Sequence, residues 1–357
     1  MPDSAGRRVT NFRQEATAQM EHPSDNSSSS EPAGMITDVP GVRVGHATDL
    51  EARTGVTVAL LERGARGAGL LLGSAGTTRG FESLYPRGTP KLVHGVCFAG
   101  GSTFGLTATG GVQRYLAERK LGLPVDDLFI PLVPSAIIFD LHVGKRDAYP
   151  DEAMGYQACV NAGAHVDEGN VGAGTGAVVG KLLHSAHAMA GGVGTASARM
   201  GAATMGALAV VNAFGDVRDP DTGRIVAGAR PAPDALEFLD STAAIGRGVV
   251  RSGPGQLTDT TLVLIVTDAA FDPITCGAIA RVAASGFAHA ISPVFTHFDG
   301  DVVIVLSAGE QTLHPLTASQ MAAQLTARAI VRGVRAARPI GDRPCAADLA
   351  AALARRP

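Results

Sequence analysis

The apolar residues of this chain come in short runs, and this feature most limits the folds open to it. The runs that have the length and composition of buried strands are 56–61, 69–72, 208–213 and 261–266. None reaches the roughly 20 residues that a membrane-spanning helix needs. The stretches with helical periodicity between and after them are 102–120, 274–285 and 321–337. The alternation predicts a mixed α/β protein with stacked sheets and helices outside.

The composition is that of a globular protein with a large core. Of 357 residues, 45% are hydrophobic and 18% are charged, and the formal net charge is −3, so no basic field indicates nucleic acid. The chain has 45 glycines, no tryptophan and only 4% aromatic residues, which predicts tight backbone packing in place of aromatic anchors. The four scattered cysteines form no CxxC pair, and we expect reduced core residues in a cytoplasmic protein without a metal or organic cofactor.

Residues 1–34 differ in composition from the rest. They contain a run of four serines and few apolar residues, so we expect a disordered tail before a single domain of residues 35–357. The sequence typical of a folded protein begins at Met35, which is a candidate for the natural first residue, with the tail as an upstream extension. No apolar core follows the early arginines, so no signal peptide is predicted.

Several familiar motifs fail on their context. Residues 172–177 fit the loose dinucleotide pattern G-x-G-x-x-A, but no convincing strand precedes them, so a packed glycine-rich loop is the preferred interpretation. His184 and His187 lack an acidic or cysteine partner nearby, which argues against a metal site. No G-x-S-x-G elbow occurs. Asp299-Gly300 lies between the apolar runs 294–298 and 302–306 and predicts a hairpin turn, or more weakly, with Asp301, a calcium loop.

The segment 258–268 carries the most specific chemistry. A polar loop leads directly into a buried-type strand, and Thr260 stands at the junction. Its hydroxyl could attack the preceding Asp259–Thr260 peptide, after which hydrolysis of the ester would leave Thr260 with a free α-amine. That amine has a reference pKa of about 7.7–8.0, so it can act as general base for its own hydroxyl at neutral pH. The alternative is an ordinary strand start with Asp as a turn residue.

The chain resembles the family P1 peptidases, which include L-aminopeptidase/D-esterase, β-peptidyl aminopeptidases and the nylon-oligomer endohydrolase. The resemblance runs from about Ile36 to about Ala337. The segments that carry it are 41–46 (GVRVGH), 54–58 (TGVTV), 99–106 (AGGSTFGL), 133–140 (VPSAIIFD), 191–197 (GGVGTAS), 209–212 (AVVN), 258–268 and 298–301 (FDGD). It implies a four-layer αββα sandwich of the self-cleaving N-terminal-nucleophile type. It also implies self-cleavage into chains 35–259 and 260–357 and association of αβ units, as a tetramer of heterodimers.

The resemblance also implies roles for individual residues. Thr260 is the expected nucleophile, and Asn212 the oxyanion-stabilising amide, with a structural amide as the alternative. Lys181 matches a lysine beside the nucleophile, and Asp299 and Asp301 match carboxylates that orient it. The expected substrate-binding residues are Gly100, Gly101, Ser102 and Phe139, the first three at a helix N-terminus where N–H groups could face the substrate.

Two departures from the family pattern bear on efficiency. Asp259 precedes the nucleophile where close relatives have Asn or Gly, and its charge, which we expect to be solvated near a surface loop, would disfavour a neighbouring oxyanion. Phe139 stands where the nylon-oligomer enzyme has a tyrosine, so one hydroxyl is missing.

The sequence therefore predicts an autoproteolytic amidohydrolase or aminopeptidase that acts on small peptides or amides through a threonine acyl-enzyme. Two alternatives remain open. One is an acyltransferase of the ornithine acetyltransferase type, and the other is an uncleaved, non-catalytic binding protein. No nucleic-acid or membrane partner is expected.

Overall fold

The computed structural model describes residues 34–86, 91–251 and 259–355. All of them belong to one compact unit, Ala33–Pro357. The predicted tail, residues 1–34, lies outside the described residues except for Gly34, so the prediction for it is untested.

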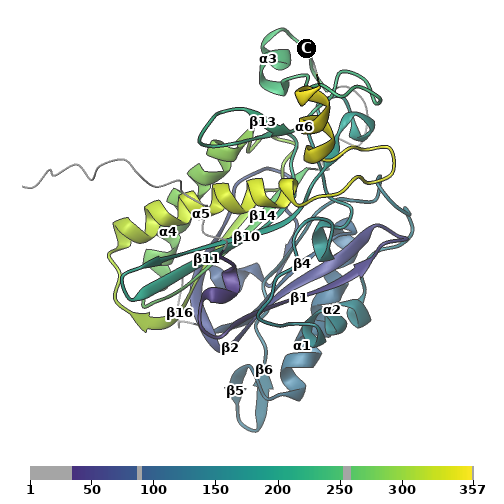
Figure 1. The fold of residues 1–357 in the computed structure, drawn as a ribbon. Helices are drawn as coiled ribbons and strands as arrows, with labels where there is room; N and C mark the ends of the chain where they lie inside the picture. Colours follow the sequence, from purple (N-terminus) through teal and green to yellow (C-terminus); the bar gives the residue numbers. More distant parts are fainter. Residues whose placement is uncertain (1–33, 87–90, 252–258, 356–357) are drawn as a thin grey trace, which may run out of the picture. The chain divides into compact units, whose positions relative to one another are not determined.

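Eight strands form one hydrogen-bonded path, a ninth, β1, pairs with β2 beside it, and together they make two sheets (Figure 1). The first sheet has the order β10 (Gly192–Met200), β11 (Ala203–Asn212), β14 (Thr260–Ala269), β16 (Val302–Gln311) and β2 (Thr54–Leu71). The second contains β2 again, with β1 (Val42–Asp49), β4 (Val93–Ala99), β7 (Ser135–Ile137) and β3 (Thr78–Arg79). The 18-residue strand β2 belongs to both sheets, because its first part pairs with β1 and β4 and its last part pairs with β16.

Alternate residues of the central strand β14 enter two different cores, as a strand covered on both faces requires. Leu262, Leu264 and Val266 pack in the core between the two sheets. Val263 and Ile265 pack on the other face, in the core beneath the helices α4 (Pro273–Ala290) and α5 (Pro315–Arg335). This strand is therefore apolar along its whole length, the pattern that the sequence shows at 261–266.

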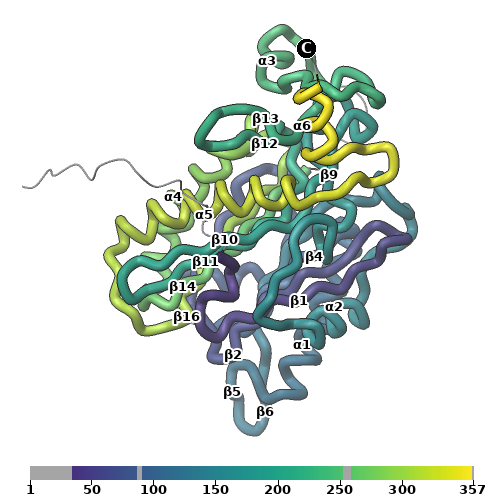
Figure 2. The backbone as a smooth tube through the Cα atoms, viewed as in Figure 1, coloured from purple at the N-terminus to yellow at the C-terminus, as the bar shows by residue number. Residues whose placement is uncertain are grey.

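Helices cover the outer faces of both sheets. Figures 1 and 2 show α4 and α5 on one side and α1 (Ala108–Glu118) and α2 (Glu152–Val160) on the other. The helix α4 begins at Pro273 because the Asp272 side chain caps it, accepting the N–H of Thr275 at 2.7 Å. The four-layer αββα architecture predicted from the sequence is confirmed.

The remaining elements are short. They are β5 (Leu123–Val125), β6 (Leu128–Ile130), β8 (Val178–Val179), β9 (Met189–Ala190), β12 (Asp216–Arg218), β13 (Ile225–Ala227), β15 (Ile291–Ser292), α3 (Ser241–Gly246), α6 (Ala346–Ala354) and the 3₁₀ turns Ile36–Asp38, Phe81–Leu84, Ser102–Thr107, Gly172–Gly174 and Ser185–His187. Among the described residues, no helix is long and apolar enough to cross a membrane. All four cysteines are buried and free, as predicted.

Two predictions about elements are wrong. The stretch 102–120 is not one helix, because a 3₁₀ turn, Ser102–Thr107, precedes α1. Asp299-Gly300 is not a hairpin turn either. Residues 294–298 form no strand, and β16 instead pairs in parallel with β14, which precedes it by the length of the helix α4 and its flanking segments. The Asp-Gly signal is local, whereas the partner of β16 is set by long-range packing.

Candidate active site

The strand directions of the first sheet bring the predicted residues together. The strands β14 and β16 are parallel and so begin at the same end of the sheet, whereas β11 is antiparallel to β14 and ends there. Thr260 is the first residue of β14, and its register partner is Asn212, the last residue of β11. Asp299 and Asp301 lie just before β16, where Asp299 forms a parallel bridge with Asp259. All of these residues are buried.

The hydroxyl of Thr260 lies against the peptide that it is predicted to cleave. Thr260 Oγ1 donates a hydrogen bond to the carbonyl oxygen of Asp259 at 2.5 Å. The same oxygen accepts the backbone N–H of Gly300 at 2.7 Å. An oxyanion that formed on this oxygen would therefore already have one backbone donor.

The Asp259 carboxylate is buried between two cations and not solvated, so that expectation is wrong. One oxygen lies 2.7 Å from Lys181 Nζ, and the other lies 2.5 Å from a guanidinium nitrogen of Arg251. Exposure is 0% for the Asp259 side chain, 3% for Lys181 and 6% for Arg251. The two cations offset the negative charge beside the Asp259 carbonyl, which removes the basis for the expected oxyanion penalty.

Lys181 links this ion cluster to the end of β11. Its Nζ also donates to the backbone carbonyl of Asn212 at 2.8 Å. Burial lowers the pKa of Lys181, and the neighbouring Asp259 carboxylate opposes that shift. The predicted position of Lys181 beside the nucleophile agrees with this geometry.

The two carboxylates before β16 have different surroundings. Asp299 accepts hydrogen bonds from the N–H and the hydroxyl of Thr296, at 2.9 and 2.6 Å. Asp301 Oδ1 accepts the N–H of Thr261 at 2.6 Å, which fixes the residue after Thr260. Burial raises the pKa of Asp299, and burial with the charge of Asp299 raises that of Asp301 well above its ordinary value.

The Asn212 amide is held by hydrogen bonds on both sides. Its Oδ1 accepts the N–H of Val178 at 3.0 Å, and its Nδ2 donates to the carbonyl of Phe139 at 3.2 Å. Phe139 itself lines a pocket next to the cluster. The structure therefore places Asn212 and Phe139 next to each other beside this cluster, and their roles stay predictions.

The turn Gly100–Ser102 does not offer its N–H groups in the way expected. Those of Gly100 and Ser102 donate to backbone carbonyls at 2.9 and 3.0 Å, and that of Gly101 donates to Asp140 Oδ1 at 2.7 Å. The N-cap of the 3₁₀ turn is Gly101, in the left-handed region (φ 78°), and Ser102 is the first residue of the turn. A substrate role for this turn stays a prediction, but one that does not use these three donors.

Two residues of the site were missed by the sequence analysis. Arg251 lies before the cleavage segment, and nothing local distinguishes it from a surface arginine. Asp140 follows Phe139 and accepts the Thr54 hydroxyl at 2.7 Å as well as the Gly101 N–H. Burial raises the pKa of Asp140 to about 6. A buried aspartate directly after an apolar run was the available signal.

A pocket of about 350 Å³ opens beside the ion cluster. Its lining includes Phe139, His142, Arg146, Lys181, His184 and Arg251. We call it the cationic pocket. No Asp or Glu from the described part of the chain lines it.

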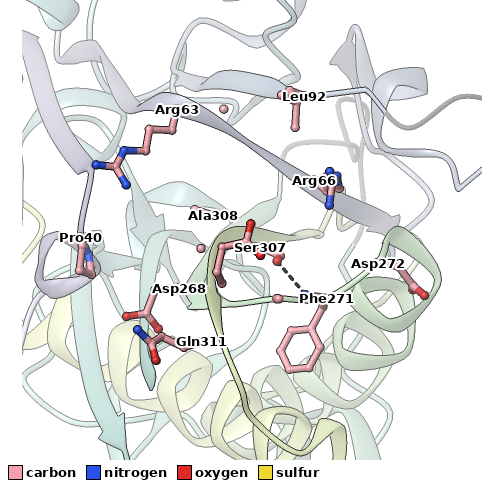
Figure 3. Close-up of a pocket in the computed structure, with 14 residues that line it drawn as sticks. Pro40, Arg63, Arg66, Leu92, Asp268, Phe271, Asp272, Ser307, Ala308 and Gln311 are labelled. Atoms are coloured by element: carbon pink, nitrogen blue, oxygen red, sulfur yellow. Dashed lines mark hydrogen bonds between the residues drawn. The ribbon is translucent and has the colours of Figure 1, made fainter. Parts of the chain in front are cut away.

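A second pocket, of about 620 Å³, lies at the other end of β14 and β16 (Figure 3). Figure 3 shows Arg63 and Arg66 on one side of it and Asp268 and Gln311 on the other. None of the predicted site residues lines this pocket.

The 3₁₀ turn Gly172–Gly174, part of the loose dinucleotide motif, packs on Thr57, whose hydroxyl accepts the Ala173 N–H at 3.0 Å. It is a packed turn, as preferred from the sequence.

Comparison with known proteins identifies the family. The sequence profile of peptidase family S58 matches residues 34–344. An uncharacterized aminopeptidase of Mycobacterium tuberculosis is 37% identical over 341 residues, covering 88% of this chain and 97% of that protein. A 6-aminohexanoate-oligomer endohydrolase of a Kocuria species is 30% identical, covering 85% of this chain and 83% of that protein.

Solved structures agree at the level of the fold. A Burkholderia β-aminopeptidase superposes with a TM-score of 0.63 at 22% identity, covering 90% of this chain and 95% of the other. The L-aminopeptidase D-Ala-esterase/amidase of Ochrobactrum anthropi, described as a variant of the Ntn hydrolase fold, gives 0.62 at 21% identity, covering 85% and 86%. The resemblance found in the sequence is thus confirmed, and the chain belongs to peptidase family S58, a family of amide-bond hydrolases.

Proposed function

We propose that the chain is a self-cleaving aminopeptidase or amidohydrolase whose nucleophile is Thr260. The observation that carries the proposal is the 2.5 Å hydrogen bond from Thr260 Oγ1 to the carbonyl oxygen of Asp259. The hydroxyl therefore lies next to the carbonyl group that it would attack, and Gly300 N–H already binds the oxygen on which the oxyanion would form.

Self-cleavage would proceed through an ester. Thr260 Oγ attacks the carbonyl carbon of Asp259, the C–N bond to Thr260 breaks, and the hydroxyl proton passes to the new α-amine. Water then hydrolyses the ester, which leaves Asp259 with an α-carboxylate and Thr260 with a free hydroxyl and a free amine. Gly300 N–H would stabilise the oxyanion of the first step.

Turnover would use the same hydroxyl with the new amine as general base. An α-amine titrates near pH 7.7–8.0, and the ammonium of Lys181 in the same cluster favours the neutral amine. We propose that Asn212 Nδ2 stabilises the oxyanion of the substrate. Asp299 and Asp301 would orient the start of β14, because Asp301 holds the N–H of Thr261 at 2.6 Å.

The proposed substrates are small peptides or amides. The names of the relatives support this range, because they include aminopeptidases and an oligomer endohydrolase. We further propose that cleaved αβ units associate, as a tetramer of heterodimers, which light scattering of the purified protein would measure.

Intact mass under denaturing conditions tests the proposal. The unmodified protein should give fragments that end at residue 259 and begin at residue 260. Thr260→Val, which keeps the shape but lacks the hydroxyl, should stay whole, whereas Thr260→Ser should still be cut. Persistence of full-length protein after long incubation near neutral pH would contradict self-cleavage and favour an uncleaved binding protein. Release of product only when an amine acceptor such as ornithine is present would indicate an acyltransferase instead.

A further inference from the structure

Asp259, whose carbonyl carbon Thr260 is proposed to attack, is held by ion pairs of its side chain. Asp259 is the acyl part of the self-cleavage reaction, and its carboxylate lies 2.7 Å from Lys181 and 2.5 Å from Arg251. Both cations are nearly inaccessible to solvent, so their charges face this carboxylate across a medium of low polarity. In the intact chain, the acyl residue of the proposed reaction is therefore held through its carboxylate.

The cationic pocket extends the same charge. Lys181 and Arg251 line it together with Arg146, and no described acidic residue does. Burial lowers the pKa of His142 on its wall, and the charges of Arg146, Arg251 and Lys181 lower it further. The three cations thus act on one point of the pocket, and the resulting positive potential attracts anions. The volume of about 350 Å³ is at the small end of ligand pockets.

We propose that the cleaved enzyme selects acyl groups that carry a carboxylate one methylene from the α-carbon, such as an N-terminal aspartyl residue. This inference rests on the proposed function. Once the bond to Thr260 is cut, Asp259 is a chain end that is no longer tethered to the nucleophile, and a substrate side chain of the same chemistry can replace it between Lys181 and Arg251. A neutral acyl side chain would bring no charge to these buried cations.

The reaction balances in two steps. Thr260 Oγ forms an ester with the acyl carbon, the amide C–N bond breaks, and the hydroxyl proton passes through the Thr260 α-amine to the leaving amine. Water then adds to the ester, which releases the free acid and restores the hydroxyl and the amine. Lys181 and Arg251 hold the substrate side chain throughout and take no part in proton transfer.

The test compares chromogenic amides that differ only in the acyl part. The p-nitroanilides of L-aspartate (linked through its α-carboxyl), L-asparagine and L-leucine are assayed with enzyme shown by mass to be fully cleaved. Asparagine is the matched control, because it has the shape of aspartate without the charge. Hydrogen bonds to charged groups predict at least a roughly tenfold higher kcat/KM for the aspartyl amide than for the asparaginyl amide.

A second measurement needs no variant. Free L-aspartate should inhibit hydrolysis of the leucyl amide competitively and more strongly than L-asparagine does.

Arg251→Met should lower the ratio of aspartyl to asparaginyl kcat/KM, and Arg146→Met, which leaves the Asp259 ion pairs in place, should lower it less. An enzyme that is cleaved and hydrolyses the neutral amides without preferring aspartyl would overturn the selectivity alone. A protein that stays whole and hydrolyses none of the three would overturn the proposed function as well.

Discussion

Replacing Asp259 with asparagine tests the buried ion cluster in the uncleaved chain. The variant is made in the Thr260→Val background, so that both proteins compared remain whole. Asp259→Asn leaves the positive charges of Lys181 and Arg251 in place and removes the negative charge between them. Removing one partner of a buried ion pair costs about 3–5 kcal/mol of stability.

This cost converts to a melting temperature through the unfolding entropy. At about 2.1 cal/mol/K per residue, a unit spanning Ala33–Pro357 has an unfolding entropy of roughly 0.7 kcal/mol/K. The expected fall in Tm is therefore roughly 4–7 °C, measured by calorimetry at neutral pH.

The matched control is an ion pair on the surface. Glu62→Gln breaks the 2.7 Å pair between Arg43 and Glu62, whose side chains are 38% and 52% exposed. Such a pair contributes about 0–1 kcal/mol, so Tm should fall by less than about 1.5 °C. Equal shifts for Asp259→Asn and Glu62→Gln would refute the argument that Asp259 is buried between two compensating cations.

Three further predictions concern other parts of the molecule. Asn212→Ala should fold but lose roughly 10²–10³-fold in turnover; near-normal kcat in steady-state assays would leave Asn212 a structural role. Burial raises the pKa of Asp140 to about 6 from 3.8, so the folded state binds the proton more tightly and stability falls as pH rises through 6. In denaturant titrations the free energy of unfolding of the unmodified protein should fall between pH 5 and 7, and in Asp140→Asn this fall should be smaller by roughly 1 kcal/mol. An equal fall in both proteins would contradict the shifted pKa. Deleting residues 1–34 should leave Tm and activity unchanged, because so polar a segment has little apolar surface to bury. A marked fall in Tm would show that it packs on the folded domain.

The sequence predicts the elements of this fold better than their partners. The runs 208–213 and 261–266 are apolar and β-branched and become the neighbouring strands β11 and β14. Residues 294–306 do not predict the parallel pairing of β16 with β14, because an apolar run does not encode which strand it pairs with. The nearby Asp-Gly turn signal favoured the wrong, local partner.

In the site, too, the sequence indicates individual residues but not the partners that surround them. Thr260 stands out because a polar stretch of sequence meets an apolar, β-branched one there, and the family resemblance points to Asn212 and Lys181. The burial of Asp259 depends on Lys181, which is far away in the sequence, and on Arg251, which has no local signal. A charged residue that follows a polar, glycine-containing stretch of sequence is normally solvated, so only the tertiary structure shows that this one is enclosed.

The order of strands in the first sheet has a consequence for the fate of the two proposed fragments. The chain that begins at Thr260 supplies β14 and β16, whereas the chain that ends at Asp259 supplies β11 on one side of that pair and β2 on the other. The two polypeptides would thus be interleaved, with the shorter one hydrogen-bonded along both of its edges to the longer one. Separating them means breaking two rows of backbone hydrogen bonds and exposing both faces of the central strands. Dissociation would then be the same event as unfolding, and dilution under native conditions would not part the fragments.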